Sequence, residues 1–385
     1  MKQRWEIKKL GEVCDVVGGS TPKTSEETYW GGEHYWISPA ELDGSKYVYA
    51  TSRTITDEGV KSAHLQMLPI GTVLLSSRAP IGKVAITRVP MYCNQGFKNL
   101  ICKNEVINEY VYWFLLNSTD YLNSLGTGAT FKEISKKVVE QVLIPVPPIA
   151  EQKKIVAELD CLSGIIEKKK QQLKEYDSLA QSIFYEMFGN PIDNEKGWEV
   201  KKLGEEFEIS SGGTPNTKNT LYWEDGDISW IGSNMCHNDI IYQNDGKYIT
   251  NEGLEHSSAK MYQDGYVIVA LVGATIGKTA LLKFQTTTNQ NVAGINVPSN
   301  RNYTSEYVFY LIQNLYGLFQ SIGNGKFKMA NLSFIRSLPL IVPPLTLQQE
   351  FASKIEAIEK QKELIKQSIA ETETLFNSRM DFYFG

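Results

Sequence analysis

Polar side chains of the same kinds occur twice in this chain, in loops framed by glycine. Residues 18–24 read GGSTPKT, and residues 211–217 read SGGTPNT. Asn and Gln amides can pair with adenine, Arg or Lys with guanine, and Thr methyls with thymine, while lysines and glycine-turn amides suit phosphates. Such loops could therefore recognise nucleic acid. The candidate residues are Thr21, Lys23, Thr24, Arg78, Lys83, Asn94, Gln95 and Lys132 in the first copy, and Thr214, Asn216, Thr217, Lys278, Asn289, Gln290, Asn291 and Lys328 in the second.

A purely structural reading of these residues stays open, and catalysis by this chain alone is not expected. Thr-Pro and Asn-Gln pairs also form turns and caps without any ligand. GATIGKT (273–279) resembles a phosphate-binding loop, but that motif needs a glycine where Val272 stands. We therefore expect a strand–turn–strand there. Neither a Gly-x-Ser-x-Gly elbow nor the Asn/Asp-Pro-Pro-Tyr/Phe segment of amino-group methyltransferases occurs in the sequence.

Cysteine and histidine usage indicates neither a metal centre nor a disulfide framework. The five cysteines and four histidines are scattered, without a Cys-x-x-Cys pair. Cys236 and His237 are adjacent, but nothing nearby completes a set of four ligands. Free thiols are typical of a reducing cytosol, and no apolar stretch approaches the ~20 residues that span a bilayer. We expect a cytoplasmic protein that does not contact a membrane.

The charge balance, taken alone, argues against nucleic-acid binding. The chain has 39 Lys and Arg against 44 Asp and Glu, a net charge of −5 and a pI near 5.6. Contact with phosphates usually leaves a basic footprint, and neither half of this chain is strongly basic. If DNA is the ligand, the positive charge must be local or be supplied by partner chains.

The sequence consists of one long unit used twice. WEIKKLGE begins at Trp5 and WEVKKLGE at Trp198, and further matching segments follow at nearly constant spacing. The period is too long for a solenoid, whose repeats span about 20–50 residues. Each copy reads as an α+β domain with short β-branched strands bounded by glycine, followed by a long helix. The expected regions are 1–145 and 193–340 for the mixed domains, and 146–192 and 341–385 for the helical regions.

The segments PVPP (145–148) and VPP (342–344) mark the start of each long helix, a position where proline is tolerated. Apolar residues then recur at steps of three and four over about four to five heptads, which is typical of a coiled coil. Neither seam is fully apolar, so we expect the two helices to pair antiparallel about a pseudo-twofold axis. Oligomerisation through the helices is the alternative. The seam residues are Ile155, Leu159, Leu162, Ile166, Leu173, Ile183, Phe351, Ile355, Ile358, Ile365, Ile369 and Phe376.

The repeated WEIKKLGE…GGSTP opening, the IGK…NQ segment and the PVPPIAEQKKIVAELD helix start closely resemble the specificity subunit of type I restriction–modification systems. The resemblance covers essentially the whole chain. Its most specific part is a Pro-Pro-x-x-x-Gln helix start, present at 147–152 and at 343–348. The second copy departs slightly, because Leu347 stands where the first has Glu151. The resemblance implies two α/β target recognition domains that each read one half of a split double-stranded DNA sequence.

The resemblance also implies partner chains and what they would supply. Two modification subunits would dock on the helical regions, carry S-adenosylmethionine and methylate adenine N6 after base flipping. Two restriction subunits, when present, would use ATP and Mg²⁺. This chain would be non-catalytic and hold no cofactor or metal, and its acidic pI would reflect phosphate contacts made by partners. The alternatives are a coiled-coil protein scaffold without DNA specificity and a stand-alone nuclease or NTPase.

Overall fold

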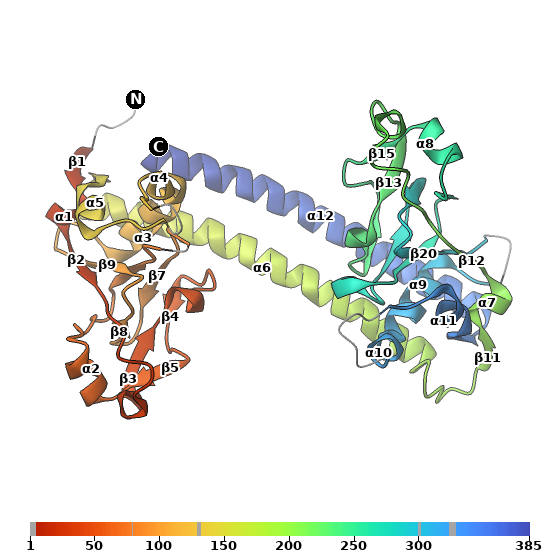
Figure 1. Cartoon of the computed structure of the whole chain (residues 1–385), viewed down its shortest axis with the longest axis horizontal. Helices are drawn as coiled ribbons and strands as arrows, with labels where there is room; N and C mark the ends of the chain where they lie inside the picture. The colour runs from red at the N-terminus through yellow and green to blue at the C-terminus, as the bar shows by residue number, and fades with distance from the viewer. Residues whose placement is uncertain (1–4, 79, 129–131, 299–301, 323–328) are drawn as a thin grey trace. The chain divides into compact units, whose positions relative to one another are not determined.

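The computed structural model describes the chain except residues 1–4, 79, 129–131, 299–301 and 323–328 (Figure 1). The chain divides into two compact units, Met1–Lys170 with Gln367–Gly385, and Gln171–Lys366. Each unit contains one mixed α+β domain and a part of both long helices. The units therefore divide within the helices, and the domain and helical-region limits expected from the sequence stay a prediction.

The first domain is built around a five-stranded sheet with apolar contacts on both faces. Its strand order is β2-β9-β6-β7-β4, and a smaller sheet has the order β5-β3-β8. The strands are β1 (Glu6–Lys9), β2 (Cys14–Gly18), β3 (Trp30–Ile37), β4 (Tyr47–Val48), β5 (Arg53–Ile55), β6 (Val73–Leu75), β7 (Val84–Thr87), β8 (Tyr92–Cys93), β9 (Lys98–Cys102) and β10 (Leu143–Val146). The helices are α1 (Leu10–Val13), η1 (Glu27–Tyr29), η2 (Pro39–Glu41), α2 (Asp57–Ser62), α3 (Asn108–Asn117), α4 (Thr119–Ser124) and α5 (Lys136–Gln141).

Strand β6 shows why the apolar run at residues 71–77 is nearly continuous. Val73 and Leu75 belong to the core that also contains residues of α3, and Leu74 belongs to a second core with residues of β3 and β8. Successive side chains of a strand point to opposite faces, so a strand that is buried on both faces needs apolar residues at every position. The sheet therefore separates two cores, with α3 on one side (Figure 1).

The second domain repeats the topology of the first. Its five-stranded sheet has the order β12-β20-β17-β18-β14, and its smaller sheet has the order β15-β13-β19-β16. The strands are β11 (Glu199–Lys202), β12 (Glu208–Ser211), β13 (Ile228–Ile231), β14 (Asp239–Ile241), β15 (Tyr248–Ile249), β16 (Met261–Tyr262), β17 (Val267–Ala270), β18 (Thr279–Leu282), β19 (Thr286–Thr288), β20 (Val292–Asn296) and β21 (Pro339–Val342). The helices are α7 (Leu203–Glu206), η3 (Thr220–Tyr222), η4 (Ser233–Met235), α8 (Asn251–Glu255), η5 (Gly273–Thr275), α9 (Ser305–Asn314), α10 (Tyr316–Gln320) and α11 (Leu332–Ser337).

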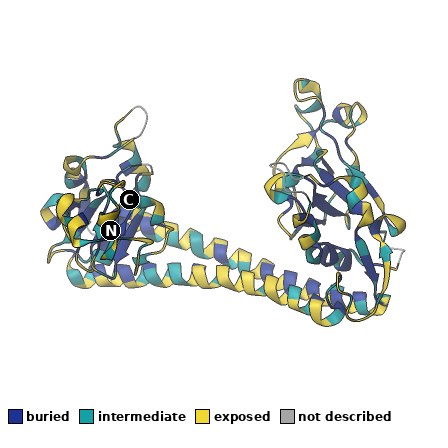
Figure 2. Cartoon of the chain, turned by 60° about the horizontal axis from the view of Figure 1, so that its bottom comes forward, coloured by how far each residue is buried: buried dark blue, intermediate teal, exposed yellow. Residues whose placement is uncertain are grey.

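Two helices of 40 residues follow the domains, as the heptad pattern predicts: α6 (Ile149–Phe188) and α12 (Leu345–Phe384). Buried and half-buried positions recur along both helices between exposed ones (Figure 2). All of the predicted seam residues are buried or half-buried. The buried ones are Ile155, Leu159, Ile166, Phe351, Ile355, Ile358 and Ile369, and the half-buried ones are Leu162, Leu173, Ile183, Ile365 and Phe376. Among the described residues, no helix is both long and apolar enough to cross a membrane.

The helices pair antiparallel inside the first unit. Glu158 of α6 accepts a hydrogen bond from Arg379 of α12. Further along α6, Lys169 donates to the Ser368 hydroxyl. The partner's number falls as the α6 number rises, so the two segments run in opposite directions.

The second unit contains an antiparallel pair of the same kind. Asp177 Oδ1 of α6 lies 2.8 Å from Lys362 Nζ of α12. The ring centroids of Phe184 and Phe351 are 5.7 Å apart. Within each unit, the antiparallel pairing expected from the seams is confirmed.

The conspicuous glutamine of each helix start ties the helix to its domain. Gln152 is fully buried, and its Nε2 donates to the carbonyls of Glu105 and Pro147, both at 2.8 Å. Its Oε1 accepts a bond from Ile107 N at 3.0 Å. Gln348 makes the equivalent three bonds in the second copy, at 2.9–3.2 Å. A buried amide with both ends satisfied explains why the motif needs Gln at this position.

Candidate nucleic-acid interface

Two tryptophans hold the glycine-framed loop of the first domain, residues 18–24. Trp36 Nε1 donates to Ser20 O at 3.1 Å, and Trp30 Nε1 donates to Lys23 O at 3.4 Å. The two indole rings meet edge to face, with centroids 5.1 Å apart. The loop backbone is thus fixed from beneath, and the side chains of Lys23 and its neighbour Thr24 remain exposed.

The second domain holds its loop, residues 211–217, in the same way. Trp230 Nε1 donates to Gly213 O at 3.0 Å, and Trp223 Nε1 donates to Asn216 O at 3.2 Å. Their ring centroids are 5.3 Å apart, again edge to face. Neither tryptophan pair was among the site residues predicted from the sequence, although the tryptophans recur at matching positions of the repeat.

A hydrogen bond joins this loop to the Asn-Gln loop in both domains. Thr21 Oγ1 donates to Gln95 Oε1 in the first domain. Thr214 Oγ1 donates to Gln290 Oε1 at 2.6 Å in the second. Both glutamines are exposed, so each keeps its NH₂ group as a fixed donor at the surface. Two loops about 75 residues apart in sequence therefore form one polar surface, as the separations of 74 and 76 residues record.

The neighbouring asparagines use part of their amide groups inside the turn. Asn94 Oδ1 accepts a bond from Gly96 N at 2.8 Å, and Asn289 Oδ1 accepts one from Asn291 N at 3.0 Å. The oxygen atoms of both asparagines therefore act as turn formers, which is the structural role left open for these residues from the sequence. In this conformation each side chain offers its NH₂ group and the second lone pair of its oxygen, so a two-point contact with adenine would share that oxygen with the turn bond.

Arg78 and Asn94 line one cavity of about 400 Å³, although they are far apart in sequence. The same cavity includes Glu133, whose Oε2 lies 3.9 Å from Arg78 Nη1. Lys98 Nζ donates to the other carboxylate oxygen of Glu133 at 3.3 Å. Glu133 and Lys98 were not candidates from the sequence, because nothing local marks residues that meet only in the fold.

A family model described as the type I restriction modification DNA specificity domain matches residues 2–175 and 195–374. This chain belongs to that family. The two matched segments correspond to the two copies of the repeat, so the chain carries two DNA specificity domains in tandem. The reading as a protein scaffold without DNA specificity is not supported.

Named relatives and solved structures agree with this family. The chain is 31% identical over 376 residues to the type I restriction enzyme MjaIX specificity subunit of Methanocaldococcus jannaschii, covering 92% of this chain and 86% of that one. It is 32% identical over 162 residues to the EcoR124I/EcoR124II specificity subunit of Escherichia coli, covering 40% of each. The fold resembles the S subunit from M. genitalium, with a TM-score of 0.57 at 13% identity, covering 99% of this chain and 96% of that one. It also resembles a chain from a structural study of complex assembly in the type I R-M system, with a TM-score of 0.63 at 19% identity, covering 99% and 98%.

None of the candidate residues that the structure describes is fully buried in either specificity domain. The exposed ones are Lys23, Thr24, Gln95, Lys132, Asn216, Thr217 and Gln290. The half-buried ones are Thr21, Arg78, Lys83, Asn94, Thr214, Lys278, Asn289 and Asn291. Lys328 lies outside the described residues.

The two lysines of the Ile-Gly-Lys turns have different surroundings. Lys83 Nζ donates to Leu42 O at 2.7 Å and to Pro39 O at 3.4 Å, so its ammonium group supports the segment after β3. Lys278 is half-buried after η5 in the second specificity domain. Phosphate contact by either lysine stays a prediction.

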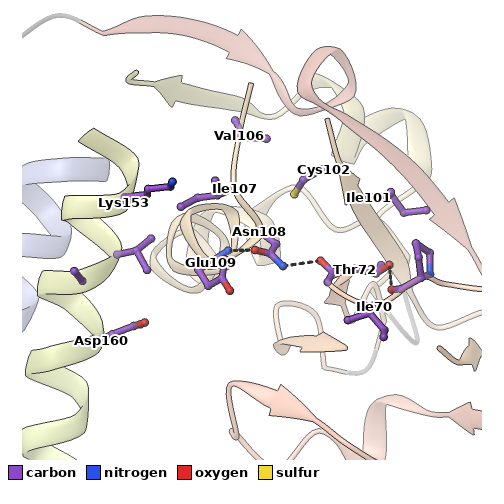
Figure 3. A pocket seen from close by; sticks show the side chains of 14 residues that line it. Ile70, Thr72, Ile101, Cys102, Val106, Ile107, Asn108, Glu109, Lys153 and Asp160 are labelled. Carbon is purple, nitrogen blue, oxygen red and sulfur yellow. Dashed lines mark hydrogen bonds between the residues drawn. The ribbon is translucent and has the colours of Figure 1, made fainter. Parts of the chain in front are cut away.

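A separate cavity of about 620 Å³ lies in the first unit, beside α6 and the start of α3 (Figure 3). Asn108 at the start of α3 donates to Gly71 O at 3.1 Å, which fixes one wall. Lys153 and Asp160 come from α6, and Glu109 comes from α3. The Asp160 carboxylate already accepts a bond from Trp113 Nε1 at 2.9 Å. Because neither duplicated loop lines this cavity, we do not include it in the candidate interface.

Cysteine chemistry does not contribute to the candidate interface. Burial raises the pKa of the Cys93 thiol and that of the Cys236 thiol to about 12 each. A thiol with that pKa is protonated near neutral pH and is a poor nucleophile or metal ligand. Among the described residues, no three His, Cys, Asp or Glu side chains gather as a metal site.

Proposed function

We propose that this chain is the specificity subunit of a type I restriction–modification assembly and that each domain reads one half of a split double-stranded DNA target. The observation that carries the proposal is the Thr–Gln bond, made by Thr21 with Gln95 and by Thr214 with Gln290. It presents an oriented amide donor beside a glycine-framed loop in both members of a DNA specificity repeat. Membership of that family gives the chain a role in recognition rather than in catalysis.

Within each domain, the chemistry separates base contacts from backbone contacts. A fixed NH₂ group on Gln95 or Gln290 can donate to an acceptor on a base edge in the major groove. The exposed Lys23 and Thr24 side chains suit phosphate oxygens, as do the exposed polar side chains at 216 and 217. Rigid loops suit this task because the protein then loses little conformational freedom on binding.

Partner chains complete the assembly in this proposal. Relatives of this chain bear the name type I restriction enzyme specificity subunit, which supports docking on modification and restriction subunits. Two modification subunits would carry S-adenosylmethionine and methylate adenine N6 in the target. Two restriction subunits, when present, would use ATP and Mg²⁺. This chain would hold no cofactor itself, and the assembly would act in the cytoplasm.

The negative net charge of the chain bears on which subunits contact the DNA phosphates. A net charge of −5 gives long-range repulsion from DNA, so much of the phosphate grip must come from other subunits. Sequence-selective retention of DNA should therefore be weak for the isolated chain and strong for the complex.

The test is selection from a randomised duplex library by the complex of this chain with its modification subunits. We expect a motif of two specified halves separated by unspecified base pairs. Replacing residues 1–145 with the equivalent domain of a relative should change one half only. If the wild-type complex enriches no sequence, the proposal is wrong, and a change in both halves would exclude independent reading by the two domains.

A further inference from the structure

Backbone hydrogen bonds show which residues of the two domains occupy equivalent positions around the Asn-Gln loop. In the first domain, Ser77 N donates to Gly96 O at 2.7 Å, and Ile134 N donates to Ser77 O at 3.0 Å. In the second domain, Leu271 N donates to Asn291 O and Ala330 N donates to Leu271 O, both at 2.9 Å. Ser77 and Leu271 are therefore equivalent, despite a one-residue difference in the turn that follows.

The next residue along each chain makes an isolated β-bridge. Arg78 pairs with Glu133 in the first domain, and Val272 pairs with Met329 in the second. Strand register adds a third position, because Lys98 faces Gly18 across the first sheet and Ala293 faces Ser211 across the second. The three charged residues of the first domain, Arg78, Lys98 and Glu133, thus correspond to Val272, Ala293 and Met329.

The charged group in the first domain forms a connected network. Lys98 Nζ lies 3.2 Å from the Ser77 hydroxyl and 3.3 Å from Glu133 Oε1, which holds the carboxylate from the sheet side. The other oxygen, Oε2, lies 3.9 Å from Arg78 Nη1. This loose ion pair keeps the guanidinium near Glu133 and leaves most of its five N–H donors available for a ligand.

The equivalent surface of the second domain is apolar. Met329 exposes 63% of its surface, and Val272 is half-buried. The adjacent Leu271 is 3% exposed and bonds through its backbone to the Asn-Gln loop. The fold does not require a large exposed methionine at this position, because the first domain has the same fold with a carboxylate there.

We infer that this position determines base preference and makes the two half-sites different: Arg78 reads guanine in the first half, and Val272 with Met329 reads the methyl group of thymine in the second. The inference rests on the proposed function. Arginine pairs with guanine O6 and N7, and apolar side chains contact the thymine methyl. Both surfaces adjoin the Asn-Gln loop, and Arg78 shares its cavity with Asn94.

The neighbouring carboxylate favours a base over a phosphate as the partner of Arg78. Glu133 weakens the attraction of a phosphate to this group, because its charge cancels one of the two positive charges of Arg78 and Lys98. The acceptors of guanine carry no net charge, so Glu133 can orient the guanidinium without repelling them. Glu133 thus acts as a positioning group for Arg78, and Lys98 in turn holds Glu133.

The experiment exchanges the three positions in the full chain, within the complex with its modification subunits. One variant carries Arg78→Val, Lys98→Ala and Glu133→Met, and the reciprocal one carries Val272→Arg, Ala293→Lys and Met329→Glu. Selection from a randomised duplex library should show the first variant losing preference for guanine at one base pair of the first half-site by about 5- to 150-fold. The second half-site should be unchanged and serves as an internal control for folding and assembly. The reciprocal variant should exchange a thymine for a guanine in the second half-site.

A second variant separates base reading from charge. Arg78→Lys keeps the positive charge but replaces the planar fork, whose donors match guanine O6 and N7, with a flexible ammonium group. It should reduce the preference for guanine at the same position while overall affinity and its salt dependence stay close to wild type. Lys23→Ala is the matched comparison, and it should weaken all sequences equally. Enrichment of an unchanged motif by the Arg78 variants, or uniform weakening without a change of motif, would overturn the inference and leave the proposed function intact. Failure of the wild-type complex to enrich any motif would overturn both.

Discussion

Thr214 Oγ1 lies 2.6 Å from Gln290 Oε1 and donates a hydrogen bond to it, and the first domain repeats the bond between Thr21 and Gln95. The bond restricts the orientation of an exposed amide, because the oxygen that accepts from threonine is held toward the neighbouring loop. Duplication of a bond between residues so far apart in sequence indicates that the fold preserves this arrangement as a unit.

Replacing Gln290 with alanine should weaken binding to the second half-site by about 1–3 kcal/mol, because one base contact is lost. Thr214→Val should cost about 1 kcal/mol, because the amide stays present but loses its orienting bond. Gln95→Ala is the matched control and should affect the first half-site only. Binding isotherms of the complex on duplexes altered in one half measure all three effects. Unchanged affinity in a folded Gln290→Ala complex would return this residue to the role of a turn former.

Lys362 should be important for the stability of the second unit. It is 5% exposed on α12 and contacts Asp177 Oδ1 at 2.8 Å and Glu359 Oε1 at 2.7 Å. Lys362→Ile should destabilise the chain by about 3–5 kcal/mol, because Glu359 would be left buried without a partner. Urea denaturation followed by circular dichroism measures the change.

The first helix supplies a matched control for that substitution. The positions equivalent to Glu359 and Lys362 are Ser163 and Ile166 in α6. The double variant Glu359→Ser with Lys362→Ile should recover most of the lost stability, because it removes the unpaired charge and adds a seam residue. A double variant as unstable as the single one would show that the charge pair itself, and not the orphaned carboxylate, sets the stability.

The stability of the first unit should depend on pH through Glu158. The hydrogen bond from Arg379 lowers the pKa of this carboxyl below its ordinary value of 4.5, against the opposing effect of burial, and Tyr383 donates a further bond. A lowered pKa in the folded state contributes stability above pH 4.5, and this contribution is lost as the pH falls through the folded-state pKa. The difference in unfolding free energy between wild type and Glu158→Gln should be constant near neutral pH and disappear in acid. An acid-independent difference would mean that the charge of Glu158 is not involved.

Thiol labelling should distinguish the cysteines by burial. Cys161 is exposed on α6, whereas burial raises the pKa of Cys93 and Cys236 to about 12. At pH 8 an alkylating reagent should modify Cys161 rapidly and leave the other two unmodified until the chain unfolds, because the thiolate is the reactive form. Peptide mass spectrometry over a time course measures the order. Modification of Cys236 before denaturation would show that the segment between η4 and β14 opens in the native state.

The sequence by itself determined the duplication, the two long helices and the seam residues along each helix. These features depend on local periodicity: apolar residues at steps of three and four identify the helix seam, and prolines mark each helix start. The glutamines at those starts were recognised through the resemblance to type I specificity subunits, of which Pro-Pro-x-x-x-Gln is the most specific part. Their role in binding the loop before α3 or α9 was not, because that loop lies more than forty residues away.

The tertiary structure alone decided which polar atoms remain available. Lys83 and Gln95 were equal candidates from the sequence, yet the fold directs the Lys83 ammonium to two carbonyls and leaves the Gln95 amide at the surface. The group of Arg78, Glu133 and Lys98 is assembled from three separate segments through strand register and one isolated bridge. Hydrogen-bond partners of this kind depend on the positions of whole strands, which no local pattern encodes.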